Sequence, residues 1–189
     1  MNPSYFDDEA AAAKLREEAL KWVGAPFGEF YSKEADPNRP APPRPPDARG
    51  AVDCIGLLQE IFTRIGASEE FVFKRESADY QSHQLGDKVL QWLRGEMDDP
   101  QSKRLAQILT ELKIPDAFND PNAVAPRDFF KPGDILVMQH HGLFHLPVLI
   151  DKDLHFVNAL PRLGVMEGTI QDATYRRYLV AAFRLKPRE

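Results

Sequence analysis

The stretch DCIGLLQEIFTRIG, residues 53–66, decides the fold expected for this chain. Its apolar residues recur at helical spacing and predict a helix with one buried stripe: Ile55, Leu58, Phe62 and Ile65. Gly66 supplies the stop signal, so Cys54 lies in the first turn. Cys54 is the only cysteine of 189 residues, which excludes an intrachain disulfide and a sulfur-rich metal site. Its thiol is either a buried core group or a nucleophile.

A second helix is predicted before this one. Ser4 and Asp7 have the spacing of a capping box, and strong helix formers run from Ala10 to Val23 before Gly24. Between the two helices lie many of the 16 prolines of the chain, concentrated in residues 37–46. Because proline lacks a backbone donor and has a fixed φ, we expect residues 37–50 to form an extended surface loop.

The spacing of apolar residues changes twice after residue 66. Residues 67–127 read as a mainly helical insertion, with helical spacing in 85–92 and 101–112. Five short β-like runs follow, in residues 134–138, 144–150, 154–159, 164–167 and 178–185. Helices first and antiparallel strands last predict an α+β fold, and the length fits a single domain over residues 1–189.

The charge balance excludes some partners. The chain has 24 Lys and Arg against 29 Asp and Glu, a formal net charge of −5, so it shows no electrostatic footprint for nucleic acid or an anionic membrane. Acidic residues occupy positions 7–9, where a signal peptide would carry positive charge, and no run of about 18 apolar residues occurs. We therefore expect cytoplasmic synthesis without a signal peptide, and no membrane partner.

The position of Cys54 predicts a reactive thiol. The helix macrodipole and the unpaired first-turn amides favour thiolate, which should lower the pKa of Cys54 below about 8.5. A thiolate nucleophile also needs a nearby imidazole and a polar group that orients it. Of the five histidines, His145 lies in a β-run, His140 and His141 are expected in the preceding turn, and His155 is expected to face away from Asn158. Spacing alone does not decide which of these residues meet.

Four short motifs and one histidine stand in order along the chain: WVGAPF (22–27), DCIGL (53–57), KPGDILV (131–137), His145 at the start of a β-run, and FVNA (156–159). In this order and spacing they resemble the motifs of the NlpC/P60 cysteine peptidases. The closing run YRRYLVAAFR (175–184) is similar to the end of the phage and gene-transfer-agent branch of that family. The resemblance extends from about Trp22 to Leu185.

The resemblance implies a papain-like α+β fold in which the nucleophile helix packs on an antiparallel sheet. It implies hydrolysis of amide bonds in peptidoglycan stem peptides, with no metal or cofactor, and a place in a phage-like tail particle. Cys54 stands at the nucleophile, His145 at the general base and Asn158 at the third polar position. Asp53 stands at the acidic residue that meets the substrate's amino group, and Tyr31 stands in for a substrate-binding tyrosine.

Three departures from the family pattern keep other functions open. Ile55 replaces a serine found in many members, Phe27 replaces a tyrosine, and Pro147 interrupts the strand that follows the histidine. The first alternative is a papain-like acyltransferase or deamidase acting on a substrate outside the cell wall. The second is a tail or wall-binding module with the same fold and little turnover.

Overall fold

The computed structural model describes residues 3–27, 52–67, 86–120, 126–140 and 143–187. Its helical elements are η1 (Tyr5–Asp7), α1 (Glu9–Leu20), α3 (Cys54–Arg64), α4 (Gly86–Arg94), α5 (Pro100–Ile108), η2 (Asp116–Asn119) and α6 (Ala173–Arg176). Its strands are β1 (Leu109–Glu111), β2 (Ile135–His140), β3 (Leu143–His145), β4 (Val148–Leu149), β5 (His155–Leu160), β6 (Gly164–Thr169) and β7 (Leu179–Leu185). The predicted α+β class is confirmed.

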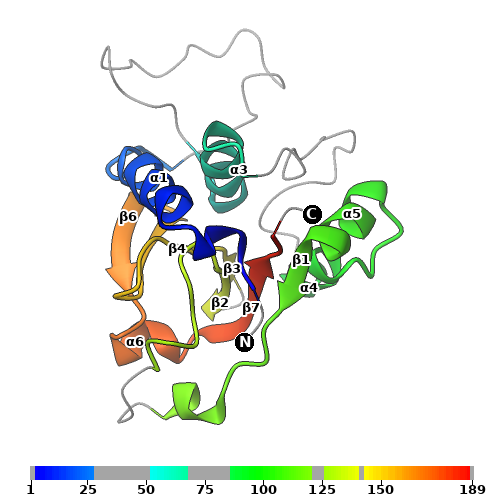
Figure 1. Ribbon diagram of the computed structural model, residues 1–189. Coiled ribbons are helices and arrows are strands. Elements are labelled where there is room, and N and C mark those ends of the chain that lie inside the picture. Colours follow the sequence, from blue (N-terminus) through cyan, green and yellow to red (C-terminus); the bar gives the residue numbers. More distant parts are fainter. Residues whose placement is uncertain (1–2, 28–51, 68–85, 121–125, 141–142, 188–189) are drawn as a thin grey trace, which may run out of the picture.

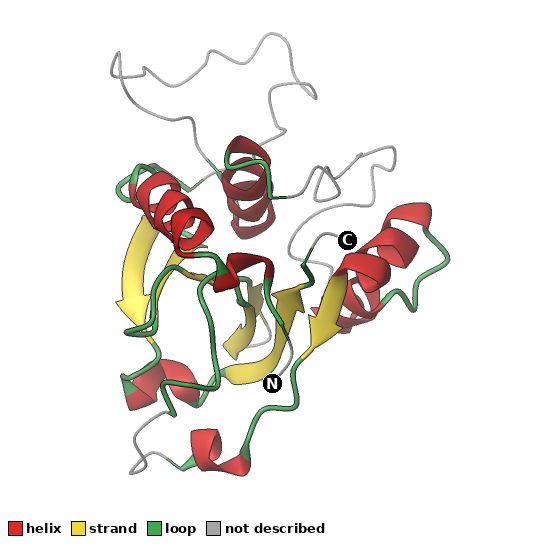
Figure 2. Cartoon of the chain, in the orientation of Figure 1, coloured by secondary structure: helices red, strands yellow, loops and turns green. Residues whose placement is uncertain are grey.

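The described strands form one antiparallel sheet. Six of them follow the order β1-β7-β2-β4-β5-β6, and β3 pairs with β2 outside this path. The longest ladder joins β5 and β6, from His155 opposite Thr169 to Leu160 opposite Gly164. Figure 2 shows the helices arranged around this sheet, with α1 and α3 on one side and α6 on the other.

Two apolar clusters cover the two faces of the sheet. The first cluster joins α1, α3, α4 and α5 to strand residues such as Val137, Val148 and Val157. The second cluster joins Phe118 and Phe130 to the alternate strand residues, among them Met138 and Phe156. Successive side chains of a strand point to opposite faces, so membership of a cluster tells which face a residue occupies.

The predicted helices and caps are largely confirmed. Ser4 and Asp7 form a complete capping box, which begins the short helix η1, and Asp8 caps α1 separately. The helix α3 begins at Cys54, and its buried stripe packs into the first cluster. Figure 1 shows α1 and α3 close to each other above the sheet.

One predicted helix was wrong at its end. The expected helix over 101–112 stops at Ile108, and β1 (Leu109–Glu111) pairs with β7, Leu109 opposite Leu185. The unpaired edge of β7 offers backbone partners to this segment, and tertiary pairing overrides the local helical spacing. The insertion therefore contributes a strand to the sheet as well as helices.

The predicted β-run over 144–150 is interrupted by proline. β3 ends at His145 and β4 begins at Val148, with Leu146 and Pro147 between them. Proline has no amide to donate, but the carbonyl of Pro147 accepts a 2.8 Å hydrogen bond from the amide of Leu136. The break lets the chain leave the ladder directly after His145.

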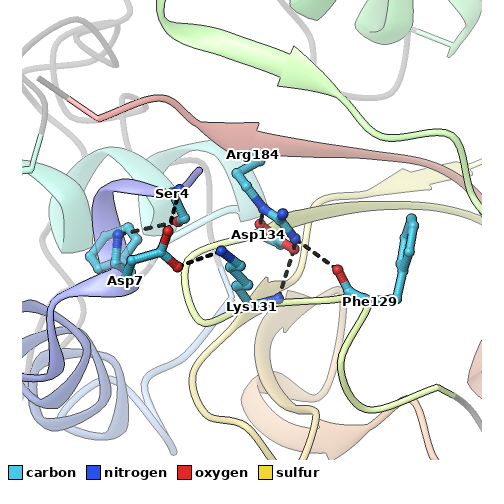
Figure 3. Close-up of polar contacts among 7 residues, drawn as sticks. Ser4, Asp7, Phe129, Lys131, Asp134 and Arg184 are labelled. Carbon is cyan, nitrogen blue, oxygen red and sulfur yellow. Dashed lines mark hydrogen bonds and ion pairs between the residues drawn. The ribbon is translucent and has the colours of Figure 1, made fainter. Parts of the chain in front are cut away.

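A polar network, buried at Asp134 and Arg184 and exposed at Asp7, holds η1 against the start of β2 and the end of β7 (Figure 3). The Lys131 ammonium contacts the Asp7 carboxylate, and the Lys131 amide donates to Asp134 Oδ2 at 2.9 Å. Asp134 in turn accepts two hydrogen bonds from Arg184. The KPGD segment seen in the sequence is therefore the turn that joins two distant parts of the chain.

Within the described ranges, none of the helices has the length and apolar character required to cross a bilayer. The predicted proline-rich loop, Tyr31, and residues 68–85 of the insertion lie outside the described residues.

Candidate functional site

The start of α3 fixes the position of Cys54. Asp53 has extended backbone angles and caps the helix, because its Oδ1 accepts a 2.7 Å hydrogen bond from the amide of Gly56. Aspartate is among the best N-cap residues for this reason. The cap makes Cys54 the first residue of α3, which confirms the predicted position in the first turn.

Backbone amides surround the thiol. The amides of Leu146, Cys54 and Ile55 each act on the sulfur in the direction that favours thiolate. The amides of Cys54 and Ile55 belong to the first turn, where helix donors have no partner within the helix. Leu146 comes from the segment between β3 and β4, so the thiol lies against the residue that follows His145.

The expected low pKa of Cys54 was wrong. Burial is the largest influence, the Asp53 carboxylate adds to it, and together they raise the pKa to about 12 against the effect of the three amides. The side chain is only 8% exposed, so the thiolate would lose most of its hydration. Cys54 is therefore a protonated thiol at neutral pH in this structure.

His145 ends β3 and lies directly opposite Met138 of β2. Burial lowers the pKa of His145, and the nearby His140 lowers it further. A neutral imidazole is the form that accepts a proton, so this environment suits a general base. Met138 belongs to the second cluster, which places the His145 ring on the face of the sheet opposite α3.

The structure brings Cys54 to the end of β3 but does not join its thiol to the ring of His145. Among the described residues, none of the hydrogen bonds connects these two side chains. The sulfur and the ring reach the end of β3 from different faces of the sheet. The predicted nucleophile and base are thus close in the fold, and their direct contact stays a prediction.

Asn158 lies in β5 opposite Met166, and its side chain is 4% exposed. It alternates with Val157 and Ala159 of the first cluster, so it shares with His145 the face opposite α3. Its Oδ1 is buried and has no hydrogen-bond partner. The predicted hydrogen bond from the His145 ring to this oxygen is absent, although the acceptor is available.

Asp53 is 1% exposed, and its carboxylate serves as the cap of α3. This position gives it a structural role, and its predicted contact with a substrate amine stays untested. Tyr31 lies outside the described residues.

The remaining described histidines occupy two other environments. His155 faces away from Asn158, as expected, and its Nδ1 lies 2.9 Å from Asp151 Oδ2. His140 was expected in a turn but is the last residue of β2, where its ring packs edge-on against Tyr178 at 4.3 Å between centroids. The sequence did not predict the contact between His140 and Tyr178. The two-residue spacing of Met138 and His140, which puts both on one face of β2, is the signal that could have placed the His140 ring.

No protein-family model matches the chain, and no curated protein matches it either. Within the described ranges, no three side chains of His, Cys, Asp or Glu gather as ligands for a metal ion would.

Proposed function

We propose that this protein is a cysteine hydrolase with Cys54 as its nucleophile and His145 as its general base. The observation that carries the proposal is the placement of the thiol at the first turn of α3, faced by three backbone amides, one of which follows His145 directly. Such amides stabilise negative charge on sulfur and on a neighbouring oxyanion.

The reaction would begin from a neutral pair, since the thiol is protonated and burial keeps His145 neutral. His145 takes the thiol proton as sulfur attacks the amide carbonyl, and the amide of Cys54 donates to the resulting oxyanion. Collapse breaks the C–N bond, and the imidazolium gives its proton to the leaving amine. Water, deprotonated by the same ring, then hydrolyses the thioester and restores the thiol.

This sequence of steps requires the His145 ring to reach the sulfur. His145 is the last residue of β3, is half-buried, and has no hydrogen bond holding its ring among the described residues. The mechanism therefore requires a side-chain rotation or a shift of the strand end that brings the ring to the sulfur. Catalytic hydrogen bonds commonly tighten only when substrate is bound.

The resemblance to the NlpC/P60 family supports the substrate class. On this basis the scissile bond is an amide of a cell-wall stem peptide, and the setting is a phage-like tail particle that opens the wall locally. Asn158 would orient the His145 ring by accepting its N–H, a role for which its Oδ1 lies buried and unpaired.

The test is digestion of purified muropeptides, read by mass spectrometry. Wild type should release the two peptide fragments, Cys54→Ala should release none, and His145→Gln should slow release by about 100- to 10,000-fold. His155→Gln is the matched control, because this ring pairs with Asp151 on the other face of the sheet and should leave the rate unchanged. Loss of activity in His155→Gln but not in His145→Gln would contradict the proposal.

One observation favours a second function, a binding module with little turnover. The thiol is buried, protonated and not hydrogen-bonded to His145. If wild type and Cys54→Ala both leave muropeptides intact while binding them equally, this second function holds. A product whose mass carries an added acyl group would instead indicate a transferase.

A further inference from the structure

A group of cationic and aromatic side chains lies at the ends of β2 and β3, next to His145. His140 is directly opposite Leu143 and His145 is two residues further along β3, so the two rings are diagonal neighbours on one face of the hairpin. Aromatic side chains at such diagonal positions of two paired strands are long enough to reach each other. The effect of His140 on the pKa of His145 agrees with this proximity.

Tyr178 connects these histidines to Arg177. The ring of Tyr178 packs against that of His140, and the guanidinium of Arg177 lies 4.8 Å from the centroid of the same ring. Arg177 Nη2 also donates a 2.7 Å hydrogen bond to the Tyr178 hydroxyl. The amide of Gln139 donates to the carbonyl of Tyr178 at 2.8 Å, which fixes this residue beside β2.

Three residues of this group, Arg177, Tyr178 and His145, have hydrogen-bond donors that no described residue accepts. The Tyr178 hydroxyl accepts from Arg177 but donates to none of the described residues. Arg177 is exposed and uses one of its five N–H donors in the described part of the chain. The ring of His145 donates to none of the described residues either.

The local charge differs from that of the whole chain. The chain carries a net charge of −5, but the exposed guanidinium of Arg177 places a positive charge beside the ring of Tyr178, which packs against that of His140. Arg177 acts on the carboxylate of Asp172, whose Oδ1 accepts a hydrogen bond from the Thr174 amide at the cap of α6. Arg177 and Arg176 both act on this carboxylate, so it offsets only part of their charge.

We propose that Arg177, Tyr178 and His140 form a subsite for the free carboxylate of a peptide substrate, adjacent to His145. An arginine fork and a tyrosine hydroxyl are suited to a planar carboxylate. This inference rests on the proposed function, because it takes the substrate to be an acidic peptide whose scissile amide reaches His145.

The experiment measures binding without turnover. The full chain carrying Cys54→Ala is titrated with γ-D-glutamyl-L-lysine amide, in which the glutamyl α-carboxylate is the one free carboxylate, and with the corresponding α-amide, while the histidine ring protons are followed by NMR. The acid should shift the His140 and His145 resonances and bind about tenfold more tightly than the amide, as expected for a charge-assisted hydrogen bond. Adding Arg177→Gln should abolish this preference.

Two controls keep the result specific. Arg127→Gln removes another exposed arginine, which pairs with Asp153 elsewhere, and should leave the preference intact. Inorganic phosphate should bind more weakly than the acid, and phosphate binding tighter than the peptide would overturn the assignment to a peptide carboxylate. Equal binding of acid and amide, or an equal effect of the two arginine substitutions, would also overturn it.

The outcome is separable from that of the proposed function. If wild type hydrolyses the acid and the amide at the same rate, the hydrolase stands and the subsite is wrong. If Cys54→Ala binds the acid selectively while wild type cleaves neither peptide, the subsite stands and the hydrolase is wrong.

Discussion

Arg184 holds Asp134 in a bidentate ion pair, donating from Nε to Oδ1 at 2.8 Å and from Nη2 to Oδ2 at 2.7 Å. Both side chains are buried, and Arg184 Nη2 also donates to the carbonyl of Phe129 at 2.9 Å. Burial raises the pKa of Asp134, and the guanidinium opposes that shift. The pair joins the start of β2 to the end of β7, and so the turn that anchors η1 depends on it.

Removing one partner of this pair should be costly. Arg184→Met leaves the Asp134 carboxyl buried without its cation and should lower the free energy of unfolding by about 3–5 kcal/mol in urea denaturation. The double variant Asp134→Leu with Arg184→Met should recover part of the loss, because no charge then stays buried. An equal loss in both variants would show that the backbone partners matter more than the charges.

Gly133 should not tolerate a side chain. Its φ is +83°, and a Cβ there would clash with the Phe6 ring, so Gly133→Ala must both strain the backbone and displace the ring. Gly66 is a matched control, because its φ of +70° is similar but a Cβ would meet nothing within 4 Å. We expect Gly133→Ala to destabilise by about 1–3 kcal/mol more than Gly66→Ala. Equal losses would mean that Phe6 can move aside.

The Cys54 thiol should react slowly and make the fold sensitive to alkali. Its pKa is raised from 9.0 to about 12 in the folded chain, so above pH 9 the unfolded chain loses a proton that the folded chain keeps. The free energy of unfolding should therefore fall as pH rises from about 9 to 12, and Cys54→Ala should remove this part of the slope. Iodoacetamide at pH 7.5 should label the native chain more slowly than the chain in urea. Rapid native labelling would contradict the burial of the thiol.

His145 should make the fold sensitive to acid. Burial and His140 lower its pKa in the folded chain, so the unfolded chain binds the proton first as pH falls below about 6.5. Stability should therefore decrease as pH falls through this region towards the folded-state pKa, and His145→Gln should reduce the slope. The measurement is urea denaturation at several pH values between 7 and 5. An unchanged slope in His145→Gln would place the acid sensitivity elsewhere.

The sequence was sufficient for those elements whose signals are local. The stripe from Ile55 to Ile65 and the stop signal at Gly66 predicted α3 because both are local to one helix. The β-runs after Pro132 were found for the same reason. β1 was missed because its partner β7 is more than 70 residues away, and Asp134 and Arg184 are 50 residues apart.

The candidate site shows the same limit. Position alone indicated a helix N-terminus at Cys54, but the pKa of the thiol depends on how deeply the fold buries it. Likewise, the order of motifs pointed to His145 and Asn158, whereas the face that each ring or amide occupies follows from register with Met138 and Met166. These are three-dimensional properties that spacing does not determine.

Asn158 should separate stability from activity. A buried acceptor without a partner costs about 1–3 kcal/mol, and an apolar group of similar shape removes that cost. Asn158→Leu should therefore leave the free energy of unfolding unchanged or raise it. If Asn158 orients the ring of His145 during the reaction, the same substitution should lower kcat for muropeptide cleavage by about 100-fold or more, with little change in KM. Asn158→Gln, which keeps the acceptor, should recover part of the rate. A variant that loses stability but keeps its kcat would instead assign Asn158 to packing, and the base would then need another orienting group.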